Sequence, residues 1–110
     1  MEVTEKKQNS TSIFKISGRL DSNTSPQFEK QLLETIANGQ KQIIIDFESL
    51  DYIASAGLRV LLKATKELKR SDGKIVLCSM RDYIKEVFDI AGFSTILPIV
   101  PTLDDALKAF

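Results

Sequence analysis

The sequence has no histidine and only one cysteine, Cys78, among its 110 residues. Without histidine, this chain cannot by itself build a histidine-based catalytic triad or a histidine-ligated metal site. A single cysteine cannot form an intrachain disulfide or supply a multi-cysteine zinc site, and it is typical of a reducing compartment. We therefore expect no metal and no cofactor.

An excess of charge of either sign is also missing, because 15 Lys and Arg residues balance 15 Asp and Glu residues. Nucleic-acid-binding domains are usually basic, so we expect no direct binding to nucleic acid. No run approaches the roughly 18 apolar residues that span a bilayer, and residues 1–10 lack the apolar stretch of a secretory signal. We expect one cytoplasmic domain over residues 1–110, without membrane insertion.

Five segments have the alternation or the β-branched composition of strands. They are residues 3–7, 11–17, 43–45, 74–78 and 96–100. The isoleucine run at 43–45 is typical of a strand buried on both faces, and Asp46 would lie near its end. Pro98 cannot donate a ladder hydrogen bond, which predicts that the last strand lies at an edge or near the end of the sheet. Gly18 is expected to end the second strand, with residues 18–21 leading into a loop, and residues 48–53 are expected to form a loop.

Four further segments repeat apolar residues at helical spacing. In chain order they contain Phe28, Leu32, Leu33 and Ile36; Leu58, Leu61, Leu62, Thr65 and Leu68; Tyr83, Ile84, Val87, Phe88 and Ile90; and Leu103, Ala106, Leu107 and Phe110. Helix starts are indicated by Thr24 or Ser25 before Pro26, by Ser79 and by Thr102. This alternation predicts an α/β fold, with a mixed sheet of about four to five strands covered by about four helices.

Ser55 stands where the second of these helices is expected to begin. The first N–H groups of a helix have no partners within it, so the Ser55 hydroxyl could simply cap the helix. Alternatively, the hydroxyl could be a site of chemical modification. Ala56 and Gly57 are small enough to let another protein approach closely, and functional residues of such sheets gather beyond the carboxyl ends of strands. Ser55 is therefore the leading candidate for a functional residue.

Two polar sets accompany Ser55. A basic stripe along the second helix consists of Arg59, Lys63, Lys66 and Arg70. It is either a solvated face or an electrostatic docking strip. The second set consists of Asp21, Ser22, Asn23 and Thr24. These residues lie beside Ser55 if the first helix starts on the same side of the sheet, and otherwise serve as turn and cap residues. Asp46, a lone acid, is expected to be a strand-end or turn residue.

Residues 50–58, LDYIASAGL, resemble the phosphorylation-site segment of the STAS family, the bacterial anti-sigma factor antagonists. Residues 18–21, GRLD, resemble that family's turn before the first helix, and Asp46 resembles its strand-end Asp. Similarity to the C-terminal portion of the family is found at Gly92-Phe93, at Ile99 and at residues 103–107, LDDAL. The resemblance covers nearly the whole chain and implies a STAS-type sheet.

The resemblance implies a binding protein rather than an enzyme. Unphosphorylated, it would bind an anti-sigma factor, usually a serine kinase, and so release a sigma factor. The kinase would phosphorylate Ser55 with its own ATP, and a serine phosphatase would remove the phosphate. The partner-binding residues would be Asp21, Ser22, Asn23, Thr24, Ala54, Ser55, Ala56, Gly57, Leu58, Arg59 and Lys63. No Gly-rich phosphate loop followed by Lys is present, which suits a substrate of a kinase rather than a kinase. We expect the free protein to be a monomer.

Two positions depart from the family pattern beside Ser55. Many members have Asp just before the phosphorylated serine, where this chain has Ala54. That change removes a carboxylate that could position the hydroxyl or bind the kinase. Many members have Ser or Thr just after it, where this chain has Ala56. Ser55 is consequently the only serine or threonine between residues 50 and 62.

Two other functions remain open. A STAS module could serve a lipid-transport complex, a transporter or a chemosensory pathway, without sigma-factor release. An acyl-transfer enzyme with Ser55 as nucleophile would need a base other than histidine. It would also lack the first glycine of the Gly-x-Ser-x-Gly motif, where this chain has Ile53.

Overall fold

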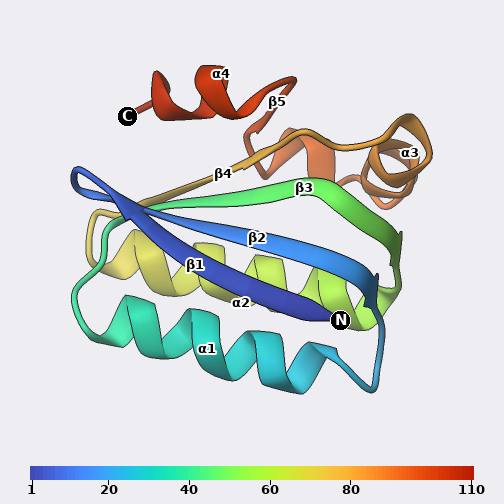
Figure 1. Ribbon diagram of the computed structural model, residues 1–110, viewed down its shortest axis with the longest axis horizontal. Helices are drawn as coiled ribbons and strands as arrows, with labels where there is room; N and C mark the ends of the chain where they lie inside the picture. The colour runs from blue at the N-terminus through green and yellow to red at the C-terminus, as the bar shows by residue number, and fades with distance from the viewer.

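Five strands and four helices make up the computed structural model, which describes residues 1–110 (Figure 1). The strands are β1 (Glu2–Gln8), β2 (Thr11–Leu20), β3 (Gln42–Ile53), β4 (Lys74–Cys78) and β5 (Ile99–Val100). The helices are α1 (Ser25–Ala37), α2 (Ser55–Arg70), α3 (Asp82–Ile90) and α4 (Leu103–Leu107), with a 3₁₀ turn, η1, at Phe93–Thr95. The predicted α/β fold class is confirmed.

The strands lie in the sheet in their order along the chain. β1 pairs antiparallel with β2, and the other neighbours are parallel. Each parallel connection steps in the same direction, so right-handed crossovers place α1 and α2 on one face of the sheet (Figure 1). The carboxyl ends of β2 and β3 lie at the same end of the sheet, and both of these helices begin there.

Side chains of β3 alternate between two hydrophobic cores. Ile43, Ile45 and Phe47 join the larger core, which α1 and α2 cover. Ile44 joins a smaller core on the opposite face, where Ala106 of α4 is buried. The isoleucine run is thus buried on both faces, as its composition predicts.

Both edges of the sheet disfavour pairing with another chain. In β1, every residue except the half-buried Val3 is exposed, and four of the exposed residues are Glu2, Glu5, Lys6 and Lys7. β5 has only two residues and lies between Pro98 and Pro101. Charges, prolines and short edge strands all oppose edge-to-edge association. The two edge positions agree with the predictions for residues 3–7 and 96–100, although the second strand is shorter.

The loop predicted at residues 48–53 is wrong, because these residues continue β3 alongside β2. Two shifts in register each insert one extra residue into β3. Its inward-facing side chains therefore change from a spacing of two to a spacing of three, at Phe47, Leu50 and Ile53. A search for strictly alternating apolar residues therefore does not detect this part of β3.

Two further expectations change with the longer strands. β2 does not end at Gly18 but continues through Leu20, and Gly18 adopts φ 84° beside a register shift. Asp46 lies within β3 rather than at its end. Asp46 is 6% exposed, and its carboxylate accepts a hydrogen bond from the Glu48 N–H at 3.0 Å. Asp46 therefore stabilises the irregular part of the strand.

The third helix also differs from its prediction. Ser79 does not cap α3: it adopts φ 62°, and Arg81 occupies the cap position. Ile90, expected in the core, is 80% exposed, whereas Phe88 is buried edge-to-face against Phe47 with 5.7 Å between ring centroids. The cap of α4 is confirmed, since the Thr102 hydroxyl accepts from the Asp105 N–H. Phe110, expected to dock this last helix, is exposed.

Ser12 offers a test of the packing of β2. Its side chain is fully buried and its hydroxyl has no hydrogen-bond partner. An unpaired buried hydroxyl costs roughly 1–3 kcal/mol, so Ser12→Ala should raise the free energy of unfolding by about 1 kcal/mol in urea denaturation. Ser17→Ala, at a half-buried site on the same strand, is the control. A clear loss of stability in Ser12→Ala would contradict this packing.

Candidate functional site

Ser55 is the first residue of α2, and its side chain is exposed. Ala54 occupies the N-cap position with extended backbone, φ −104° and ψ 172°, and no side chain caps the helix. The interpretation of Ser55 as an N-cap is therefore wrong. Its hydroxyl is turned to solvent on the first turn of a helix instead of being used to hold that turn together.

The first turn of α2 is held by its contact with the end of β2. The Ala54 N–H donates to the Leu20 carbonyl at 2.9 Å. A Cβ on Gly57 would lie 2.8 Å from Leu20 side-chain carbons and 3.0 Å from Ile53, so only glycine permits this close approach. Gly57 and Leu58, expected to contact a partner, are buried in this fold. They support the surface around Ser55 from beneath.

The turn before α1 is tied by hydrogen bonds within the chain. The Asp21 carboxylate accepts from the N–H groups of Asn23 at 2.9 Å and Thr24 at 3.2 Å. The Thr24 hydroxyl donates to the Arg19 carbonyl at 2.8 Å and accepts from the Asp21 N–H at 2.9 Å. Thr24 stands at the cap position of α1, but its hydroxyl holds this turn instead of capping the helix.

The same turn sets the charge of Asp21. The hydrogen bond from the Asn23 N–H, reinforced by those from Thr24, lowers the pKa of the Asp21 carboxyl below its ordinary value of 3.8. Arg19 adds a weaker contribution, with its Nε 3.8 Å from an Asp21 carboxylate oxygen. Asp21 is thus ionised at neutral pH and fixed in direction.

The two helix starts share one surface, as expected if α1 begins on the same side as Ser55. Ser22 of the turn and Ala56 and Arg59 of α2 line a common hollow. The remaining lining residues are Ser25, Pro26, Glu29 and Val60. We call the exposed residues Ser22, Asn23, Ser55 and Arg59 the switch surface.

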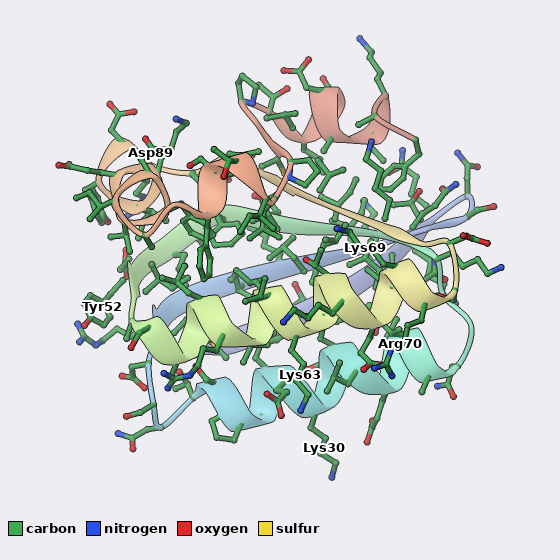
Figure 2. The ribbon with its side chains drawn as sticks, turned by 180° about the vertical axis from the view of Figure 1, so that it is seen from behind. Lys30, Tyr52, Lys63, Lys69, Arg70 and Asp89 are labelled. Atoms are coloured by element: carbon green, nitrogen blue, oxygen red, sulfur yellow. The ribbon has the colours of Figure 1, made fainter.

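The basic stripe of α2 is partly neutralised. Lys63 lies between α2 and α1, 3.5 Å from a carboxylate oxygen of Glu29 (Figure 2). Arg70 pairs with Glu67 of its own helix at 3.4 Å. Arg59 and Lys66 are exposed and make no ion pair. Two of the four cations of the stripe are therefore paired within the chain, and the unpaired cation closest in sequence to Ser55 is Arg59.

Sequence reasoning missed an aromatic and cationic cluster beside the site. The Arg19 guanidinium carbon lies 4.1 Å from the centre of the Tyr52 ring, and Tyr52 lies at the end of the molecule where α2 begins (Figure 2). Asp51 pairs with Arg81 at 2.7 Å, and Arg81 also donates to the Tyr83 hydroxyl. The sequence pattern does not reveal the cross-strand pairing of Arg19 with Tyr52, because it predicts neither residue to lie in a strand.

The structure also bears on a metal site, a reactive cysteine and a membrane-spanning helix. No group of three or more Cys, Asp or Glu side chains is arranged to hold a metal ion. Burial raises the pKa of the Cys78 thiol to about 11, with a smaller contribution from the Asp46 carboxylate, so the thiol is protonated at neutral pH. None of the helices has the length and apolar character needed to cross a membrane.

Several known proteins are similar to this chain in sequence or in fold. A family model described as the STAS domain matches residues 2–106. BtrV of Bordetella bronchiseptica, a proposed anti-sigma factor antagonist, is 36% identical over 110 residues, covering 100% of this chain and 95% of that protein. A proposed anti-sigma factor antagonist from Thermotoga maritima has the same fold, with a TM-score of 0.92, 20% identity, and coverage of 96% of this chain and 92% of that one. The Bacillus protein SpoIIAA in its phosphorylated form gives a TM-score of 0.76, with 22% identity and 97% coverage of each chain.

Gly57 provides a test of the contact beneath Ser55. Gly57→Ala should lower the free energy of unfolding by about 1 kcal/mol, because the cost of overpacking against Leu20 exceeds the gain in helix propensity. Urea denaturation measures the change. In the Leu20→Ala background the obstructing side chain is gone, so Gly57→Ala should there be neutral or stabilising. Equal losses in both backgrounds would show that the contact does not restrict residue 57.

Asp21 provides a pH test of the turn before α1. Its pKa is lowered in the folded protein, so its contribution to stability is present above the ordinary value of 3.8 and is lost as the pH falls through the folded value. The wild type should therefore lose more stability than Asp21→Asn between about pH 5 and pH 2.5. Urea midpoints at each pH measure the difference. Parallel curves for the two proteins would refute the assigned hydrogen bonds.

Proposed function

This chain belongs to the STAS domain family, and on that premise we propose a partner switch centred on Ser55. The protein is an anti-sigma factor antagonist: unphosphorylated, it binds an anti-sigma factor and so releases a sigma factor. The observation that carries the switch is the exposed Ser55 hydroxyl on the first turn of α2, where it makes no capping contact. The fold does not need that hydroxyl, so it is available to be modified.

The proposed partner is a serine kinase that brings its own ATP. A bond forms between Ser55 Oγ and the γ-phosphorus as the bond to ADP breaks, and the hydroxyl proton leaves to a base of the kinase. This chain supplies only the acceptor, consistent with a sequence that has neither histidine nor a Gly-rich phosphate loop followed by Lys. A serine phosphatase restores the hydroxyl by hydrolysis. The protein itself is a regulator without catalytic activity.

Phosphorylation would act locally on the switch surface. It brings about −1.5 to −2 charges, which a helix N-terminus favours by roughly 0.3–1 kcal/mol. The fold should therefore tolerate the phosphate without rearrangement. A protein packed over Ser55 would instead have to desolvate a dianion, and an uncompensated buried charge is strongly unfavourable. The switch is accordingly one of contact and charge.

The partner is proposed to lie across both helix starts. Ser22, Asn23, Ser55, Arg59 and Lys63 are exposed and would contact it directly. The half-buried members of the proposed interface are Asp21, Thr24, Ala54 and Ala56. Gly57 and Leu58 act indirectly, by holding the first turn of α2 in place. Residues 1–110 would work as one domain in the cytoplasm, where such a kinase has access to ATP.

Mass spectrometry tests the site directly. Incubation with the native kinase and ATP should add one phosphate to the wild type and none to Ser55→Ala. Ser22→Ala should still gain one phosphate, and it serves as the control for hydroxyls on the same surface. Because Ser55 is exposed and caps nothing, Ser55→Ala should change the free energy of unfolding by less than about 0.5 kcal/mol. Phosphate retained by Ser55→Ala, on Ser22 or on Thr24, would move the site elsewhere.

A further inference from the structure

Arg59 lies one helical turn beyond Ser55 on the same side of α2. The two residues are four apart and both are exposed. Side chains at this spacing are neighbours on the helix surface, with Cβ atoms about 5–6 Å apart. Arg59 also reaches the hollow between the two helix starts, alongside Ser22 and Ala56. A charged group attached to Ser55 would therefore lie within reach of the Arg59 side chain.

The guanidinium of Arg59 is available for a new partner. It makes no ion pair, although two other cations of the basic stripe do so. Glu29, the acid that lines the same hollow, is already paired with Lys63. Asp21, in the turn that borders the hollow, is paired with Arg19 and holds backbone N–H groups. The neighbouring carboxylates are thus engaged, and Arg59 keeps its charge uncompensated.

We infer that Arg59 is the phosphate-binding residue of the switch, a conclusion that rests on the proposed phosphorylation of Ser55. Its planar guanidinium donates paired, charge-assisted hydrogen bonds to two phosphate oxygens. The phosphate also lies at the positive end of α2, whose first N–H groups lack helical partners. Besides the Arg59 guanidinium, the hollow has a second polar group without a partner. Ser25, one of its lining residues, is 4% exposed, and its hydroxyl makes no hydrogen bond.

This pairing makes the switch act on two contacts at once. In the unphosphorylated protein, Arg59 offers an uncompensated cation to an acidic side chain of the anti-sigma factor. After phosphorylation, the same guanidinium is held by the phosphate of its own chain. The partner then meets a dianion at Ser55 and loses the cation at Arg59. Phosphorylation thus both introduces a repulsive charge and withdraws an attractive one.

The pairing can be measured without any kinase. Phosphoserine is introduced at position 55 by genetic encoding, and the second pKa of the phosphate is followed by ³¹P NMR. An adjacent guanidinium favours the dianion, so this pKa should be lower in the protein with Arg59 than in Arg59→Gln by about 0.3 unit or more. Arg59→Lys should restore part of the shift, because it keeps the charge but loses the paired donors.

Lys66→Gln is the matched control, since Lys66 is the other exposed, unpaired cation of the stripe. Lys66 lies 11 residues beyond Ser55, about 16 Å along the helix axis, so its removal should leave the phosphate pKa unchanged. Identical titrations of the wild type and Arg59→Gln would overturn the inference, as would equal shifts in Arg59→Gln and Lys66→Gln. Failure of a native kinase to modify Ser55 would instead count against the proposed function, and leaves this titration unaffected.

Discussion

The contact between Gly57 and Leu20 is the constraint on which the functional surface depends. A Cβ on Gly57 would lie 2.8 Å from Leu20, and the backbone of Ala54 is bonded to the Leu20 carbonyl in the same place. These two contacts seat the first turn of α2 against the end of β2. Ile53 and Leu58 are buried on either side of this turn, whereas Ser55 between them is exposed. A serine one turn further along α2 would not lie beside the N–H groups that lack helical partners. A serine within β3 would be held in place by the pairing of that strand with its neighbours.

The rest of the surface is fixed by polar contacts that leave few groups unengaged. Hydrogen bonds from Asn23 and Thr24 hold Asp21, and ion pairs hold Lys63 and Asp51. A surface arranged in this way needs little reordering when a partner docks, which reduces the entropic cost of binding. It would also concentrate the effect of the proposed modification, because the added charge would fall beside Arg59, a cation that makes no ion pair within the chain. The physical change is small and local, and the response of the partner can still be large.

Much of the fold follows from local sequence signals, whereas the pairing of side chains does not. The isoleucine run of β3 and the Thr102 cap are each predicted from a few neighbouring residues, and the structure confirms both. The second half of β3 was missed because its two bulges depend on register with β2, which no local pattern encodes. Ser55 was correctly placed at a helix start, but its capping role could not be decided without knowing where β3 ends. The ion pair of Lys63 with Glu29 joins two helices, so only the packed structure reveals it.

The proposed switch requires that a partner senses the presence of a dianion at one exposed hydroxyl. It is tested most directly by calorimetric titration of the native anti-sigma factor against this protein, with serine and with phosphoserine at position 55. Phosphoserine is expected to weaken binding at least about 100-fold, because the partner must bury an uncompensated charge, while the circular dichroism of the free protein stays the same. Equal affinity of the two forms, with both folded, would contradict it.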